Sequence, residues 1–458
     1  GYNAMTVNTA GGTQNVAVGN YALDALTSGD HNTALGYEAL SANTGGGQNT
    51  AVGMYALALN VSGSANNALG YNALGANTTG EENTAVGHRA AQTVTTTAGQ
   101  TAIGFEALKA NVGNYNTAVG VRAQSAAGGA GDNTAFGYEA LKVNATGSAT
   151  VGIGMKALTA NTSGVNSVAV GFEALKANTT ADNNIAIGYR ALLANTEGPR
   201  NIGIGTNAYS GSDTEGDNIA IGYDVMTTNT AGGQYNLGIG NYALDALTSG
   251  DENVALGHGA MGVMTTGGYN VAVGKNALDA MTTGNYNTAV GQNALSTCTT
   301  ADSNTGIGQG ALFYCTDGHS NTTLGYDAGN PVTTGDNNLL LGFNAGTSSS
   351  QALVNDENNH IVLGDDNITN AFIKVDWTVN SDARDKMNFS ECPHGLSFVN
   401  DLETYKYVHR KSRTDATPHG DYKYGFKAQE ILALEGDDPV VIDNKDENKL
   451  KLKDSQLI

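Results

Sequence analysis

One glycine recurs every 17 residues through most of the chain, and this repeat limits the fold more than any other feature. It stands at 20 positions from Gly19 to Gly342, and 17 of the 19 intervals are 17 residues long. The exceptions are the 16-residue interval 104–120 and the 18-residue interval 222–240. A unit this short cannot bury an apolar face alone, so successive units must stack on one another. The repeat therefore predicts a solenoid.

The consensus of the unit, N-x-A-[VIL]-G-x-x-A-L-x-x-x-T-x-G, favours β-structure. Asn stands four residues before the glycine in 17 of 20 copies, and Ala stands three residues after it in 19 of 20. Asn, Thr and Gly are poor helix formers, and N-[TVI]-A-[VIL]-G alternates with the period of a strand. We expect one strand before the recurring glycine and a second short strand at the Ala-Leu pair. The T-x-G segment would form a turn in which its Gly adopts a positive φ.

These features predict a mostly β protein with three parts. Residues 1–346 form a parallel β-solenoid or β-roll of about 20 coils, one for each recurring glycine. Residues 347–380 form a linker and a β-rich connector, and residues 381–458 form a small α+β domain. A thin solenoid of small residues has little core of its own, so packing three copies side by side would bury far more surface. Together with the family resemblances given below, this predicts a homotrimer.

Stacked coils place equivalent side chains in columns. The recurring Asn is expected to form an amide hydrogen-bond ladder. Cys298 and Cys315 are one 17-residue interval apart, and parallel side chains are poorly placed for a disulfide, so two free, core-like thiols are predicted. The two positions after the glycine vary most. Their aromatic residues either dock sugars or lie at a seam between chains or at a solvated edge, and they include Tyr37, Tyr71, Tyr138, Phe172, Tyr189, Tyr223, Tyr326 and Phe343.

The charge of the chain disfavours several classes of partner. The net charge is −21, and residues 1–380 carry 10 Lys and Arg against 28 Asp and Glu. No basic stripe is available for a phosphate backbone or an anionic lipid surface, so neither nucleic acid nor membrane binding is expected. No apolar run approaches the ~20 residues that a membrane helix needs. Motifs such as H-x-x-x-H and C-x-x-C are absent from the sequence, so no metal and no cofactor are predicted.

The A-[VI]-G-x-x-A core of the unit resembles the head repeats of trimeric autotransporter adhesins. The resemblance covers residues 1–346, although the repeats of that family are shorter. It implies a left-handed parallel β-roll in each of three associated chains.

Two further motifs lie near the C-terminal end: S-D-A-R-D-K at 381–386 and Y-G-F-K-A-Q-E-I at 424–431. Together they resemble the endosialidase-type intramolecular chaperone domain of bacteriophage fibres, a self-cleaving peptidase family. The resemblance covers residues 381–458. It implies that three chaperone copies guide three shaft chains into register, after which each copy cuts itself off.

Carried onto this sequence, the resemblance implies that Ser381 is the nucleophile and Lys386 its base. The chain would be cut between Asn380 and Ser381. A Ser hydroxyl needs a nearby base, and a Lys with a pKa lowered by burial can serve. Asp382 and Arg384 would hold the local geometry. The residues of the second motif are expected at a packed helix start, and they are Gly425, Phe426, Gln429 and Glu430.

The sequence as a whole predicts a bacteriophage tail fibre or spike. Such a protein is made in the host cytoplasm and then resides in the virion tail, beside other virion tail proteins. It contacts a host cell-surface glycan or outer-membrane protein, and its only enzymatic activity would be a single-turnover autoprotease. Two alternatives remain. A bacterial trimeric surface adhesin explains the repeat but not the Ser381–Lys386 pair, and the chain could also be the non-catalytic part of a polysaccharide depolymerase tailspike.

Overall fold

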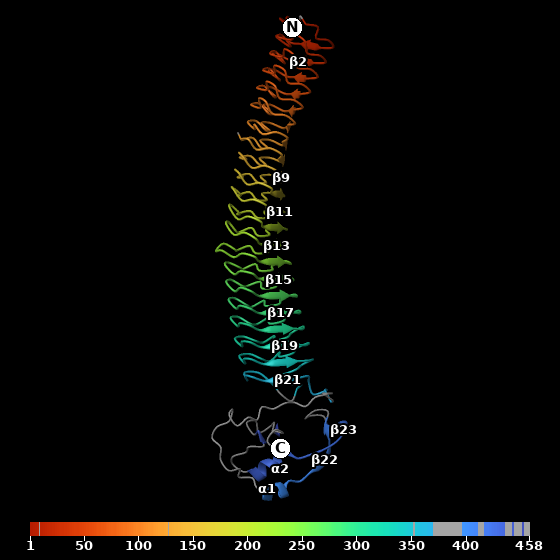
Figure 1. Ribbon diagram of the computed structural model, residues 1–458, viewed down its shortest axis with the longest axis vertical. Coiled ribbons are helices and arrows are strands. Elements are labelled where there is room, and N and C mark those ends of the chain that lie inside the picture. The colour runs from red at the N-terminus through yellow and green to blue at the C-terminus, as the bar shows by residue number, and fades with distance from the viewer. Residues whose placement is uncertain are drawn as a thin grey trace.

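The computed structural model describes residues 1–8, 10–126, 128–350, 353–369, 396–410, 416–435, 442–443 and 451–452. The residues up to 369 form a long, gently curved rod (Figure 1). It is a parallel β-solenoid with one three-residue strand in each coil, and the strands form one sheet of 21 strands. The predicted fold class, a mostly β chain with a 17-residue solenoid, is confirmed.

The strands of the solenoid follow one another at nearly constant intervals. They are β1 (Val16–Val18), β2 (Thr33–Leu35), β3 (Thr50–Val52), β4 (Asn67–Leu69), β5 (Thr84–Val86), β6 (Thr101–Ile103), β7 (Thr117–Val119), β8 (Thr134–Phe136), β9 (Val151–Ile153), β10 (Val168–Val170), β11 (Ile185–Ile187), β12 (Ile202–Ile204), β13 (Ile219–Ile221), β14 (Leu237–Ile239), β15 (Val254–Leu256), β16 (Val271–Val273), β17 (Thr288–Val290), β18 (Thr305–Ile307), β19 (Thr322–Leu324), β20 (Leu339–Leu341) and β21 (Ile361–Leu363).

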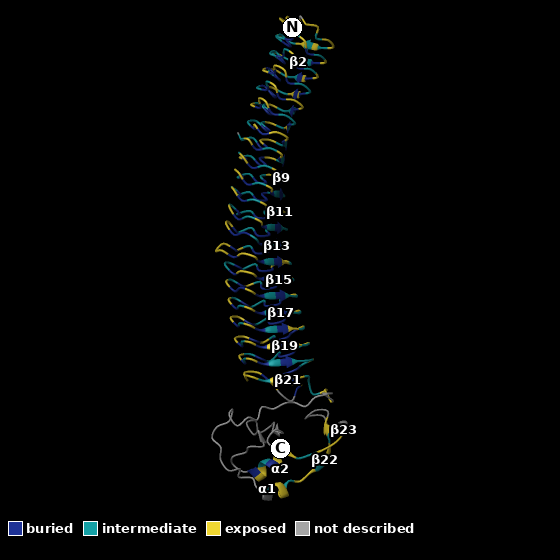
Figure 2. Ribbon diagram, viewed as in Figure 1, coloured by how far each residue is buried: buried dark blue, intermediate teal, exposed yellow. Residues whose placement is uncertain are grey.

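Each strand pairs in parallel with the strand of the next coil, and equivalent residues face each other. In β10 and β11, for example, Val168 pairs with Ile185 and Ala169 with Ala186. The central residue of a strand points into the coil, where Ala169 is fully buried, and its two neighbours point outward. The same burial pattern repeats along the rod (Figure 2). The core is therefore a narrow column of small central residues and of the Ala-Leu pairs that follow each strand.

The recurring glycine ends each strand and bends the chain sharply. Its φ lies between 113° and 147° from Gly19 to Gly342, a region that L side chains rarely adopt. The next coil also lies against it. A Cβ added at Gly188 would stand 2.3 Å from the carbonyl oxygen of Gly205. Backbone conformation and close coil stacking thus both require glycine at this position.

Two predicted details of the coil are wrong. The Ala-Leu pair forms a turn, not a second strand, and the Leu adopts a positive φ, as Leu40 does at 54°. The Gly of T-x-G, such as Gly46, does not have a positive φ in most coils; Gly11 and Gly232 are the exceptions at this repeat position. The left-handed conformation of Leu40 is held by its complete burial and by a hydrogen bond from its N–H to the carbonyl of Ala56 in the next coil. Stacking thus overrides the local preference of Leu.

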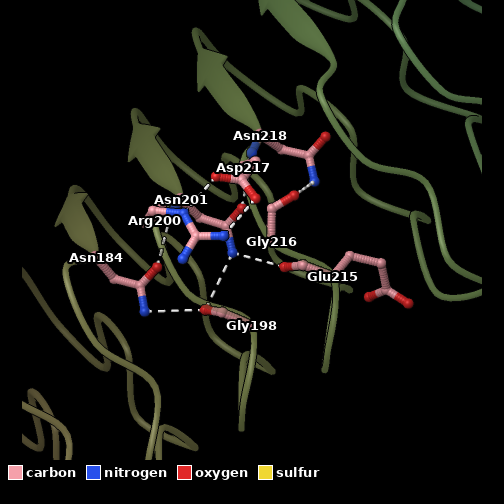
Figure 3. A network of polar contacts seen from close by, with 8 residues as sticks. All are labelled: Asn184, Gly198, Arg200, Asn201, Glu215, Gly216, Asp217 and Asn218. Carbon is pink, nitrogen blue, oxygen red and sulfur yellow. Dashed lines mark hydrogen bonds and ion pairs between the residues drawn. The ribbon is translucent and has the colours of Figure 1, made fainter.

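The Asn that precedes most strands forms the predicted amide ladder inside the solenoid. Figure 3 shows Asn184, Asn201 and Asn218 on successive coils. The backbone N–H of Asn201 donates to Oδ1 of Asn184 at 2.8 Å, and its side-chain amide donates to the carbonyl of Glu215 at 2.7 Å. Because these amides are buried, each hydrogen bond removes the cost of an unpaired polar group.

A second column of buried Asn was not predicted. It lies seven residues after the strand-end glycine, and its members are Asn43, Asn60, Asn77, Asn111, Asn144, Asn161, Asn178, Asn195 and Asn229. Asn178 donates to Oδ1 of Asn161 at 2.8 Å and to the carbonyl of Ala181 at 3.1 Å. From Leu247 to Val332 the same position is apolar or Cys. The shaft thus has a polar second column in its first part and an apolar one in its last part.

Replacing Asn178 with leucine is expected to lower the free energy of unfolding by about 1–3 kcal/mol, because the change leaves Asn161 and Ala181 with buried, unpaired oxygens. Met281→Leu alters the same column where it is already apolar. It should therefore lower the free energy of unfolding by less than about 1.5 kcal/mol. Denaturant unfolding followed by circular dichroism compares the two variants. Equal losses of stability would contradict the assigned role of the amide column.

Cys298 and Cys315 occupy this second column and are both buried and free. Burial raises the pKa of the Cys298 thiol, and the neighbouring Cys315 raises it further. The prediction of two free, core-like thiols is confirmed.

The irregular intervals leave the sheet undisturbed. Across the 16-residue interval β6 pairs in register with β7, and across the 18-residue interval β13 pairs in register with β14. The sheet also continues past residue 346, because β21 pairs in parallel with β20 across a 22-residue step. The stacked coils therefore extend into the segment expected to be a linker and connector.

The described part of the C-terminal region is α+β, as predicted. It contains α1 (Leu396–Asp401), β22 (Tyr405–Arg410), β23 (Pro418–Gly425) and α2 (Ala428–Glu435), and two short strands, β24 (Ile442–Asp443) and β25 (Lys451–Leu452). The strands β22 and β23 form an antiparallel pair, as do β24 and β25.

Candidate functional site

The outward side of the 21-stranded sheet, called here the strand face, carries an unbroken apolar row with one residue from every strand. It consists of the first and third residues of each strand. The third residue is apolar in every coil, and it is about half exposed in Leu35 (47%), Leu69 (50%), Phe136 (55%) and Leu324 (51%). The first residue is mostly Thr, Val or Ile. A continuous exposed apolar strip of this length marks an interaction surface.

Aromatic side chains form a second surface feature beside the strand-end glycines. In the first seven coils every coil contributes one ring, and neighbouring ring centroids are 5.1–6.1 Å apart. We call this set the aromatic ladder; its members are Tyr2, Tyr21, Tyr37, Tyr55, Tyr71, His88 and Phe105. Shorter runs occur farther along, such as Phe172 with Tyr189 and Tyr326 with Phe343.

The repeat position of each ring determines how neighbouring rings meet. Rings at the same position in adjacent coils stack, as Tyr71 and His88 do with an interplanar angle of 21°. Rings that alternate between the first and second position after the glycine meet edge to face, as Tyr37 and Tyr55 do at 87°. The sequence alone therefore encodes a herringbone arrangement from Tyr2 to Tyr71 and a stacked arrangement from Tyr71 to Phe105.

The middle of the shaft carries ion pairs at the second position after the glycine. Glu173 binds Lys176 at 2.7 Å and Arg190 of the next coil at 3.2 Å. The hydrogen bond from Lys176 is the main reason that the pKa of Glu173 is lowered. Glu106 and Glu139 have similar partners. The Lys partners lie within one coil, and the Arg partners link adjacent coils. None of these pairs brings two carboxylates together, as a glycoside hydrolase site requires.

The predicted cleavage site lies outside the described residues. This applies to Asn380, Ser381, Asp382, Arg384 and Lys386. The Ser–Lys dyad and the cut before Ser381 therefore stay predictions.

The residues of the second motif lie where a strand passes into a helix. Gly425 ends β23, Phe426 follows it, and Gln429 and Glu430 stand in the first turn of α2. Phe426 packs on Ile431, whose side chain is almost completely buried. The expected packed helix start is present at this position.

A small polar cluster joins the beginning of α2 to β22. Lys427 binds Glu430 at 2.7 Å, and its ammonium lies 3.6 Å from the ring centroid of Tyr405. The hydrogen bond to Lys427 lowers the pKa of Glu430. Tyr405 donates to Glu403 at 2.6 Å, and this bond is the main cause that raises the pKa of Tyr405 to about 12. The cluster connects the helix start to the strand through contacts that are exposed to solvent, so it contributes little stability.

The buried second Asn column was missed in the sequence although the repeat carried its signal. The second Asn column recurs at the same 17-residue interval as the first. Within the described ranges no group of three His, Cys, Asp or Glu residues could hold a metal ion. No helix among those residues has the length and apolar character of a membrane span.

Comparison with protein-family models and with curated proteins found no relative of this chain.

Proposed function

We propose that the chain is the shaft of an adhesive viral tail fibre or spike, built from three copies that associate along the strand face. The observation that carries this proposal is the apolar strip that runs unbroken over the 21 strands. As a single chain, a rod with this strip would expose apolar surface over its full length. Association with further copies would bury the strip while leaving the polar loops in water.

The thinness of the solenoid supports the same conclusion. Its interior is filled mainly by Ala, Leu and Asn, so each coil buries little apolar area. Three rods packed through their strand faces would bury additional apolar area.

The C-terminal region is proposed to be the intramolecular chaperone. Every coil offers nearly the same strand to a partner, so a shift of one coil would leave the contacts between chains matched. Such a repetitive rod needs its register set from one end. A terminal domain that associates first meets this need, and the second motif at the start of α2 supports the assignment.

The intact mass of the expressed protein tests this proposal. We expect the wild type to yield a fragment that ends at Asn380. Ser381→Ala should remain at the full mass of 46.8 kDa, because the attacking hydroxyl is lost. Lys386→Met should also stay uncut, whereas Ser390→Ala, a nearby serine outside the motif, should be cut like the wild type. A wild type that stays uncut would contradict the self-cleavage proposal.

A further inference from the structure

The aromatic ladder is not needed for the coils to stack. Tyr37, Tyr71 and Phe105 each expose 38–40% of their surface. Elsewhere the equivalent position holds residues such as Val121 or Lys275, and the strands there pair in the same register. The uninterrupted run of seven rings is therefore a property of the first seven coils that the fold does not explain.

The spacing of the rings fits a linear ligand with a repeating unit. The neighbouring centroids, 5.1–6.1 Å apart, follow one another coil by coil along the shaft. An extended polysaccharide advances by a comparable length for each pyranose ring. The C–H groups of a pyranose carry partial positive charge and pack on the electron-rich faces of aromatic rings. From Tyr2 to Tyr71 neighbouring rings meet edge to face, so this part of the ladder has ring faces that no parallel neighbour covers, whereas Tyr71, His88 and Phe105 stack on one another. Several such contacts in a row can bind a chain whose single sugars bind weakly.

The charge around the ladder favours a neutral glycan. Residues 1–110 contain two cations, Arg89 and Lys109, against six carboxylates. A polyanionic glycan would be repelled by this excess of negative charge. Polar side chains also flank the rings, since Glu38, Asn72 and Arg89 each follow a ladder residue directly. They supply hydrogen-bonding groups for sugar hydroxyls beside the apolar ring faces.

We propose that the aromatic ladder is a binding strip for a neutral polysaccharide that lies along the first seven coils. The proposal rests on the proposed function as a host-contacting fibre, and it names the chemistry and the location of the glycan contact. Each chain carries the complete ladder, so the strip does not depend on how many copies associate.

Affinity electrophoresis of the purified full chain tests the proposal, with dextran, β-1,3-glucan or mannan in the gel as neutral probes and polysialic acid as the anionic probe. We expect at least one neutral polymer to retard the wild type and polysialic acid to leave it unchanged. Tyr37→Ala combined with Tyr71→Ala should weaken the retarding interaction by at least about tenfold, since two ring contacts are lost.

A matched control is Tyr138→Ala combined with Tyr189→Ala. These tyrosines occupy the same repeat position and expose 44% and 43% of their surface, but they lie outside the ladder. The control should bind like the wild type. The proposal is overturned if no neutral polymer retards the wild type, or if both double variants behave alike. It is also overturned if the ladder variant loses association between chains, measured as solution mass, instead of glycan binding. A wild type of single-chain mass that still binds would count against the trimer and not against the ladder.

Discussion

Gly36→Ala is expected to lower the free energy of unfolding by roughly 3 kcal/mol or more. Gly36 has a φ of 147°, and a Cβ there would stand 2.5 Å from the carbonyl oxygen of Gly53 in the next coil. The substitution therefore imposes both backbone strain and a clash that must separate two coils. Because the clashing atom belongs to the backbone, no side-chain rotation can relieve it. The midpoint of denaturant unfolding, followed by far-ultraviolet circular dichroism, measures the effect.

Gly45→Ala provides the control in the same coil. The nearest atom to an added Cβ at Gly45 is the Ser28 hydroxyl, 3.6 Å away, and its φ is not positive. The free energy of unfolding of Gly45→Ala should differ from that of the wild type by no more than about 0.5 kcal/mol. If both alanine variants unfolded at the same midpoint, the strand-end glycine would not have the role assigned to it.

Ile153→Lys combined with Ile187→Lys should separate the chains of the proposed trimer. Both side chains lie on the strand face, two coils apart, and expose 38% and 39% of their surface. Two charges would have to be desolvated in each copy when the strand faces meet, a cost that association cannot offset. The variant should sediment as single chains. Its thermal midpoint as a single chain should change little, because both sites are already partly in water.

The matched control places the same two charges, with the same spacing, on exposed loop positions. Thr146→Lys combined with Thr180→Lys also changes residues two coils apart, and both threonines are exposed. This variant should keep the wild-type mass. Dissociation of both variants would point to a general effect of charge, and dissociation of neither would remove the strand face as the interface.

Much of the shaft could be predicted because its repeat is so regular. The position of the strand, the parallel register, the Asn ladder and the free thiols at Cys298 and Cys315 all follow from placing equivalent residues above one another. The turn at the Ala-Leu pair did not follow. Leu in isolation disfavours the left-handed conformation that Leu40 adopts, and only the stacked neighbours hold it there. Local preference and coil stacking conflict at this position, and stacking determines the result.

The functional surfaces were only partly predictable. The variable positions after the glycine were recognised as candidates for sugar contact or for a seam between chains. The continuity of the ladder was missed, because its rings alternate between two repeat positions, as Tyr37 and Tyr55 do. Side chains at these two positions lie in one row of rings because the chain turns at the glycine. The Ser381–Lys386 pair lies outside the described residues and remains a prediction from the motif.

The mass of the purified protein in solution, measured by multi-angle light scattering on the uncut Ser381→Ala variant, tests the central claim most directly. A fibre shaft associated through its strand face should appear as a species of three chains. A species with the mass of one chain, 46.8 kDa, would contradict the account, since the apolar strip would then face water without a second copy of the chain to cover it.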